Sequence, residues 1–384
     1  MSASTRSPFY GPEHEAFRAA MRRFVEREVT PHVEAWEAAG AFPRELYAMA
    51  AEIGVLGLGF AQEYGGNDGD LFMTIVATQE LARCGAGGVL ASLMSHTIGC
   101  PPIVHAGSEA IKRKVLPPVL RGEKISALAI TEPSGGSDVA NLRTSARRDG
   151  DHYVVNGSKT FITSGMRADF YTIAVRTGGP GAGGVSLLLI EKGTPGFTQT
   201  PLQKMGWLCS DTATLHFDDC RVPVSNLVGV ENQGFKTIMR NFNRERIFLA
   251  AGANGFARVC LDEALAWAQQ REMFGGRLID QQVTRHKLAD MAMRIEATQA
   301  LLELLAWRVE QGDAPVGEIC LLKNQATQTM AHCASEAVQL HGGAGFIRGV
   351  KVERIYREVK VNAIGGGAEE VMRDLAARQL GFHA

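Results

Sequence analysis

The sequence predicts an α+β protein of three domains, which are an N-terminal helical domain (1–123), a central β-barrel-like domain (124–232) and a C-terminal four-helix bundle (233–384). Hydrophobic residues recur at helical spacing before residue 120 and after Gly234, whereas the chain between them has short runs rich in Val, Ile, Thr and Phe. Strands and helices do not alternate, which argues against a doubly wound nucleotide-binding fold.

The N-terminal domain begins with a helical pattern over Glu13–Glu37, in which Pro31 is expected to kink or divide the helix. Further helical runs are predicted at Leu71–Arg83 and Glu109–Leu120, and such helices commonly pack as a bundle. The apolar residues of the first pattern recur at steps of three and four: Phe17, Met21, Phe24, Val25 and Val29.

The central segment contains a strong hairpin signal, because His152–Val155 and Lys159–Thr163 flank Asn156-Gly157. Gly179–Gly184 matches the letters of a dinucleotide fingerprint, but it lies between two predicted strands and opens no helix. We therefore expect a flexible hairpin loop there. The other predicted strands are Phe170–Arg176, Val185–Glu191 and Thr214–Phe217.

The C-terminal domain is predicted to begin with one very long helix, from Phe235 to about Met273. Its middle, Ala250–Gly255, has only small side chains apart from Asn254, which suits a close helix crossing. Two further helices are expected at about Asp280–Glu310 and Val316–His341. A last helix is expected to start near Glu369, after three glycines.

Composition favours an ordinary globular protein, with 45% hydrophobic and 21% charged residues. A formal net charge of −1 gives no long-range attraction to nucleic acid or anionic membrane. The seven cysteines include no CxxC pair, so neither a metal site nor a disulfide framework is predicted. The N-terminus lacks the apolar core of a signal peptide, and the apolar runs are too short to span a membrane. We expect a bacterial cytoplasmic protein.

The run Ala129–Asp138 (AITEPSGGSD) resembles the first signature of the acyl-CoA dehydrogenase family, departing from it at Asn141. The physical chemistry suits a flavin site, because Thr131 offers a hydroxyl and the adjacent glycines allow close backbone approach. Ser137 is implied to contact both FAD and the pantetheine arm of the substrate. Without the family, the run is a polar turn. The cofactor residues implied here are Leu128, Ala129, Ile130, Thr131, Gly136 and Ser137.

A second motif, Phe161–Gly165 (FITSG), is similar to the W-I-T-N-G of the same family. The resemblance places Phe161, Ile162 and Thr163 at the flavin, with phenylalanine keeping the packing surface of tryptophan and losing its N–H donor. By itself this segment is a plain strand.

Two later motifs also resemble the family. Arg271–Gln282 resembles R-x-x-F-G-x-x-I-x-x-x-Q, although Gly275 is also a typical helix C-cap. Gln339–Phe346 resembles the second signature, which continues to Arg354 and Glu358 but departs at Gly349. The family reaches the FAD of a neighbouring subunit with the Arg271 motif, which implies a homotetramer or a dimer. The cofactor residues implied are Arg271, Phe274, Gln282, Gln339, Gly342 and Gly343, joined by Ala368 and Glu370 of the last helix, whose free N–H groups face the cofactor.

The position of the catalytic base departs from the commonest family pattern. The usual glutamate falls on Gly366, which has no side chain but keeps a backbone N–H for the substrate oxyanion. Glu245 precedes Arg246 at the position where isovaleryl-CoA and long-chain members carry their base. We therefore expect Glu245 to be the base. The alternatives are Glu369 or Glu370 as the base, with Glu245 a helix carboxylate paired with Arg240 or Arg244.

The resemblance implies α,β-dehydrogenation of an acyl-CoA to the trans-2-enoyl-CoA, in which Glu245 takes the α-proton and FAD the β-hydride. The substrate contacts implied are Ser137, Asn243, Arg246 and Gly366, and the acyl group is expected to be branched or longer than butyryl. An electron-transfer flavoprotein is the implied acceptor. The alternatives are an oxidase, a monooxygenase or a non-catalytic flavoprotein of the same fold. Near-neutral charge and the chain end at Ala384 argue against a DNA-associated relative.

Overall fold

The computed structural model describes residues 7–382, and its elements run helices, then strands, then helices. This order confirms the predicted architecture. Residues 1–6 and 383–384 lie outside the described part, so the expectations about a leader and about the end of the chain fall partly on residues that the structure does not describe.

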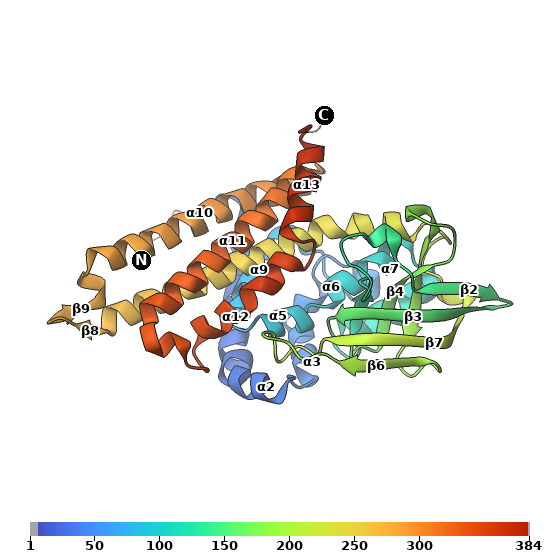
Figure 1. Ribbon diagram of the computed structural model, residues 1–384, viewed down its shortest axis with the longest axis horizontal. Helices are drawn as coiled ribbons and strands as arrows, with labels where there is room; N and C mark the ends of the chain where they lie inside the picture. Colours follow the sequence, from blue (N-terminus) through green and yellow to red (C-terminus); the bar gives the residue numbers. More distant parts are fainter. Residues whose placement is uncertain (1–6, 383–384) are drawn as a thin grey trace.

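Among the N-terminal helices, α2 and α3 lie at the bottom of Figure 1, whereas α5 and α6 lie near the centre and α7 lies at the sheet. Pro31 divides the first helical pattern as predicted, because a π turn (Val25–Val29) and a 3-10 turn (Thr30–His32) separate α1 from α2. Several shorter helices were not predicted, since they are too short to show a hydrophobic period. The helices are α1 (Pro12–Phe24), α2 (Val33–Ala39), α3 (Glu45–Glu52), α4 (Leu71–Ala82), α5 (Gly87–Leu93), α6 (His96–Gly99), α7 (Pro101–Ala106) and α8 (Glu109–Leu120).

The central domain is a seven-stranded sheet, at the right of Figure 1. Its order is β1-β4-β2-β3-β7-β6, with β5 paired to β4. β1 runs parallel to β4, with Ser126 opposite Phe170. The strands are β1 (Ser126–Ala129), β2 (Ser145–Asp149), β3 (His152–Ile162), β4 (Phe170–Arg176), β5 (Val185–Glu191), β6 (Phe197–Pro201) and β7 (Ala213–Pro223).

The predicted hairpin at Asn156-Gly157 is wrong, because β3 runs straight through both residues. The pairing register of β3 with β7 shifts there, which marks a β-bulge. Gly157 has a φ of +138°, and a Cβ on it would lie 2.8 Å from the Cα of Thr144. The Asn156 amide exchanges hydrogen bonds with Asp219 on β7. Glycine at position 157 therefore lets β3 lie close to the backbone of Thr144. The chain reverses earlier, near Gly150, between β2 and β3.

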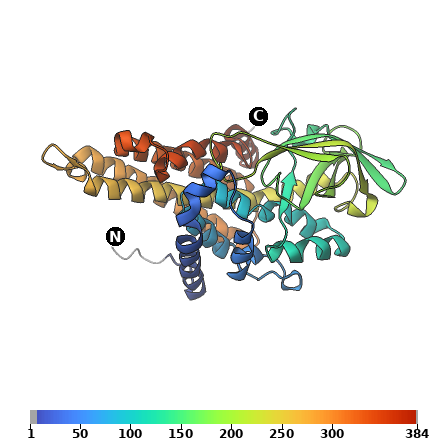
Figure 2. The ribbon, with the colours of Figure 1, turned by 90° about the horizontal axis from the view of Figure 1, so that it is seen from below.

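The C-terminal bundle follows the predicted pattern except for α12, which was not predicted. Small side chains let α9 cross α4 closely, since a Cβ on Gly255 would lie 2.8 Å from the Cβ of Ala82. Figures 1 and 2 show α9 extending from the sheet to the far end of the bundle. The elements are α9 (Gly234–Gln270), β8 (Glu272–Met273), β9 (Gly276–Arg277), α10 (Gln282–Glu310), α11 (Val316–His341), α12 (Lys351–Ile364) and α13 (Glu369–Gln379).

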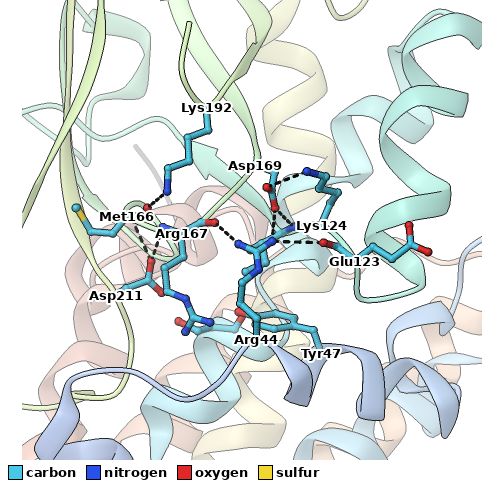
Figure 3. Close-up of polar contacts among 11 residues, drawn as sticks. Arg44, Tyr47, Glu123, Lys124, Met166, Arg167, Asp169, Lys192 and Asp211 are labelled. Carbon is cyan, nitrogen blue, oxygen red and sulfur yellow. Dashed lines mark hydrogen bonds and ion pairs between the residues drawn. The ribbon is translucent and has the colours of Figure 1, made fainter.

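A polar network joins the sheet to the N-terminal helices (Figure 3). Arg44 donates to the Arg167 carbonyl at 3.0 Å and to the Asp169 carboxylate at 2.6 Å. Arg167 in turn donates to the Phe42 carbonyl, and its own N–H is held by Asp211. These contacts fix the loop that follows β3, and therefore also the C-terminal end of β3.

The long helices pack against one another through small and aliphatic side chains, including Ala250, Leu302 and Ala334. Their other faces carry charged residues. Over residues 7–382, none of the helices is both long and apolar enough to cross a membrane.

Candidate active site

A cavity of about 1250 Å³ lies where the three domains meet. Single drug-sized ligands occupy pockets of roughly 300–1000 Å³, so this one has room for a large ligand or for two ligands. Its walls come from α5, the loop after β1, the end of β3, the first half of α9, and the turn Gly365–Ala368 between α12 and α13.

The structure brings Glu245 and Gly366 together. Gly366 has a φ of +65°, and a Cβ built on it would lie 3.6 Å from Glu245 Oε1. The same Cβ would lie 2.2 Å from Leu249 Cδ1, one helical turn beyond Glu245 on α9. A side chain at position 366 would therefore require Leu249 to shift, and the Glu245 carboxylate lies beside the place where that side chain would begin.

Glu245 is in a setting that suits a proton acceptor. Its Oε2 is shut off from solvent and has no hydrogen-bond partner among the described residues. Burial raises the pKa of Glu245 to about 7, against the opposing pull of the Arg246 and Lys323 cations. A carboxyl group with this pKa is partly ionised at neutral pH and is basic enough to take a proton from carbon.

The alternative bases have other contacts. Glu369 accepts hydrogen bonds from Thr327, Gln328 and Arg373, which together hold its pKa below the ordinary value although burial opposes them. Glu370 is exposed and does not line the cavity. Both lie in the first turn of α13, as expected for charges that stabilise a helix N-terminus. Glu245 forms no ion pair with Arg240 or Arg244, all three being described residues.

Arg246 is 6% exposed, and its Nε has no partner within residues 7–382. Its Nη1 donates to Asn243 Oδ1 at 3.2 Å, and its guanidinium lies 5.7 Å from the Phe242 ring centroid. Asn243 does not line the cavity. Asn243 therefore orients Arg246, which faces the cavity.

The loop after β1 is held by a buried ion pair. Glu132 Oε1 lies 2.8 Å from Lys159 Nζ, and the same carboxylate accepts the N–H groups of Arg143 and Thr144. Burial opposes the ionisation of Glu132, but Lys159 and these donors hold its pKa down at about 2. Lys159 also donates to the Ile130 carbonyl. The pair fixes the loop that carries the TEPSGGSD sequence.

The opposite wall includes Trp207, whose φ is +53°. Glu358 on α12 accepts the Trp207 N–H at 2.9 Å and the Gly87 N–H at 2.8 Å, which joins the wall to α5. Burial and the nearby Glu37 raise the pKa of Glu358 to about 8. The backbone of this wall is therefore fixed from α12.

The residues of the cavity fit a flavin and a polar ester. Phe161 has a φ of +61° and is 69% exposed, so its ring offers a flat surface at the cavity wall. Gly136 packs closely against Thr131 of the same loop, since a Cβ there would lie 3.1 Å from Thr131 Cγ2. Several buried polar atoms without partners in the described chain line the cavity: Ser95 Oγ, Trp207 Nε1, Glu245 Oε2 and Arg246 Nε. A bound ligand with hydrogen-bonding groups would satisfy these four atoms.

The predicted site residues fall into three groups. Ala129, Asn243 and Glu370 lie near the cavity in sequence without lining it. A distal group lies at the other end of the bundle, around the β8–β9 hairpin at the far left of Figure 1 and the end of α11: Arg271, Phe274, Gln282, Gln339, Gly342 and Gly343. The cavity itself brings together Leu128, Ile130, Thr131, Gly136, Ser137, Phe161, Ile162, Thr163, Glu245, Arg246, Gly366 and Ala368.

Three residues of the site were missed by the sequence reasoning, namely Lys159, Trp207 and Lys323. Lys323 could have been identified from the sequence as an unusual residue. It shares a helix face with Ile319 and Met330, and a lysine on an apolar face is uncommon. The roles of Lys159 and Trp207 depend on contacts with residues distant in sequence.

Within the described residues, no group of three or more His, Cys, Asp or Glu side chains is arranged to hold a metal ion.

Three family models match consecutive parts of the chain. They describe the N-terminal domain (residues 11–123), the middle domain (residues 127–220) and the C-terminal domain (residues 232–381) of acyl-CoA dehydrogenases. Together these matches cover nearly the whole chain.

Individual proteins agree with these models. An acyl-CoA dehydrogenase of Emericella nidulans is 38% identical, covering 97% of this chain and 92% of the relative. The mitochondrial long-chain specific acyl-CoA dehydrogenase of Mus musculus is 36% identical, covering 97% and 87%. The crystal structure of a candidate acyl-CoA dehydrogenase of Mycobacterium smegmatis superimposes with a TM-score of 0.97 at 48% identity, covering 98% of this chain and all of that one.

Proposed function

This chain belongs to the acyl-CoA dehydrogenase family, and we propose that Glu245 is the base with which it oxidises an acyl-CoA to the trans-2-enoyl-CoA. FAD is the cofactor, and when bound it supplies the acceptor for the β-hydride. The observation that carries the proposal is the position of the buried Glu245 carboxylate beside Gly366, at the junction of α9 and the glycine turn.

Several residues of the cavity take part in removing the α-proton, each in a different role. Glu245 takes the proton, and its pKa of about 7 makes it a stronger base than an exposed glutamate. The Gly366 N–H donates to the thioester oxygen, where negative charge develops as the proton leaves. Ser137 and Arg246 hold polar parts of the substrate, and apolar walls exclude water from the reacting carbon.

The acyl group is proposed to be branched or longer than butyryl. One part of the cavity is lined by apolar side chains around Gly252, which offers an acyl chain an apolar wall. The similarity to a long-chain specific relative supports the same direction. The apolar lining residues are Leu90, Met94, Phe248, Leu249 and Phe256.

The distal group is proposed to serve a neighbouring subunit in a homotetramer. Phe274 is 93% exposed and Phe346 is 84% exposed, so both offer uncovered aromatic surface far from the cavity of their own chain. Arg271 is suited to a pyrophosphate, because its guanidinium presents a fixed fork of donors. Electrons are proposed to pass to an electron-transfer flavoprotein.

Anaerobic mixing of the FAD-loaded protein with acyl-CoAs tests the function. We expect the oxidised flavin absorbance to bleach, most completely with branched or longer chains than butyryl-CoA. A profile that peaks at butyryl-CoA would contradict the proposed acyl group. Absence of bleaching with every ester would favour the monooxygenase or non-catalytic alternatives, and oxygen consumption on re-aeration would identify an oxidase.

A further inference from the structure

The glycine turn that presents the Gly366 N–H has no side chains of its own to hold its backbone in one conformation. Gly365, Gly366 and Gly367 carry no side chains, and the last two have φ angles of +65° and +107°. Glycine has the largest backbone freedom of any residue. An N–H that must point at a developing charge therefore needs support from another element, since catalysis depends on donors that are held in place beforehand.

Lys323, a buried residue of α11, forms hydrogen bonds with backbone carbonyls before and after Gly366 in the sequence. Lys323 Nζ donates to the Ala363 carbonyl at 3.2 Å and to the Gly367 carbonyl at 2.8 Å. The two carbonyls flank Gly366 in sequence. Lys323 is fully buried, and it has no carboxylate within 4.0 Å in the described part of the chain. Its ammonium is thus directed to the backbone of the turn rather than to an ion pair.

We propose that Lys323 is a positioning residue of the active site, which clamps the turn so that the Gly366 N–H and the Glu245 carboxylate face the same substrate. This inference rests on the proposed function of those two groups. Neighbouring residues of α11 hold the start of α13, directly after the turn. Asn324 donates to the Glu369 carbonyl at 2.9 Å, and Thr327 donates to the Glu369 carboxylate.

The charge of Lys323 adds a second effect. Lys323 and Arg246 both favour the ionised form of Glu245, while burial opposes it. The charged groups around Lys323 are Glu369 on α13, with Arg246 and Glu245 on α9, and the Cys320 thiol lies one turn earlier on α11. Removing the ammonium leaves Arg246 as the nearby cation, so the pKa of Glu245 is expected to rise further.

Two variants separate the clamp from the charge. Lys323→Met removes both, whereas Lys323→Gln removes the charge but keeps a shorter N–H donor. Lys287→Met is the matched control, because Lys287 belongs to the same bundle but pairs with Glu336 outside the cavity. The measurement is the single-turnover rate of flavin bleaching against pH, with the Kd of the acyl-CoA and the FAD content of each variant.

We expect Lys323→Met to slow bleaching by about tenfold or more, with a smaller change in the Kd of the acyl-CoA, since small misplacements of reacting groups have effects of this size. Lys323→Gln should recover part of the rate. Both variants should shift the pH midpoint upward by roughly 0.5 or more, and Lys287→Met should shift neither rate nor midpoint.

A native rate and midpoint in both Lys323 variants would overturn the inference, provided that the unmodified protein bleaches. Failure of the unmodified protein to bleach would overturn the proposed function instead. If neither variant retains FAD, hydrogen exchange of residues 361–372 decides. The clamp predicts faster exchange there in Lys323→Gln than in Lys287→Met, and equal exchange contradicts it.

Discussion

Glu245 combines a buried carboxylate with two neighbouring cations, and its titration should control the reaction. The base must be ionised, and its pKa is raised to about 7 by burial. We therefore predict that the single-turnover rate of flavin bleaching rises about tenfold per pH unit below a midpoint near 7 and levels off above it. A rate that is flat between pH 5 and 8 would contradict this assignment.

The same burial predicts a gain in stability when the charge is removed. The folded pKa of about 7 lies above the ordinary 4.5, so ionised Glu245 destabilises the fold fully above pH 7, and this effect disappears as pH falls to 4.5. Glu245→Gln should raise the free energy of unfolding at pH 8 by up to about 3 kcal/mol. Thermal unfolding at pH 8 and pH 5 measures this, and the difference from the unmodified protein should shrink at pH 5.

Gly366 is restricted both by its backbone and by its neighbour. A Cβ would require a non-glycine residue at a φ of +65° and would lie 2.2 Å from Leu249 Cδ1. Gly366→Ala is predicted to slow flavin bleaching by tenfold or more, which is a rise of at least about 1.4 kcal/mol in the activation free energy. Gly366→Ala combined with Leu249→Ala should recover only part of the rate, because the backbone strain remains. Full activity of Gly366→Ala alone would show that the turn tolerates a side chain.

At the scale of elements, the long periodic helices could be predicted from the sequence, whereas the bulge at Gly157 and the helix α12 could not. Long helices such as α10 and α11 were predicted with ends within about two residues of those observed, since many periods of apolar residues agree. Asn156-Gly157 was misread because a bulge and a turn use the same residues, and only the contact with Thr144 distinguishes them. α12 was missed within a stretch read for its family motif.

The loop after β1 depends on the Glu132–Lys159 pair. Removing one partner of a buried pair leaves an uncompensated charge, which typically costs 3–5 kcal/mol. Lys159→Met is predicted to destabilise the protein by about this amount and to reduce FAD retention. Arg221→Ala, which breaks the exposed Asp149–Arg221 pair in the same sheet, should cost at most about 1 kcal/mol. Equal effects of the two substitutions, measured by denaturant unfolding and FAD content, would contradict the role of the buried pair.

At the scale of the whole molecule, one chain forms a cavity and leaves the distal group uncovered. The order of domains and the motifs that line the cavity were predictable, because they are local in sequence. The pairing of Glu245 with Gly366 was suggested by family resemblance, and the structure adds their proximity. Lys323 stands out in the sequence as a lysine on an apolar helix face, but the backbone groups that Lys323 and Glu358 hold could not be predicted, because each contact joins segments distant along the chain.

The subunit arrangement can be tested by complementation. Arg271→Ala subunits keep Glu245 and their own cavity, whereas Glu245→Gln subunits keep Arg271. If Arg271 serves a neighbour's FAD, co-expressed mixed oligomers should show dehydrogenation well above that of either variant alone. Activity no greater than the sum of the two separate variants would indicate that Arg271 serves its own subunit or has no role at the cofactor.

Anaerobic flavin bleaching by a preferred acyl-CoA, compared among the unmodified protein, Glu245→Gln and the control Glu370→Gln, tests most directly whether Glu245 is the base. We predict rapid bleaching in the unmodified protein and in Glu370→Gln, whose exposed side chain does not line the cavity, and a rate lowered by at least about a thousandfold in Glu245→Gln with FAD still bound. Equal bleaching in Glu245→Gln and the unmodified protein would contradict the account and assign the proton to another residue.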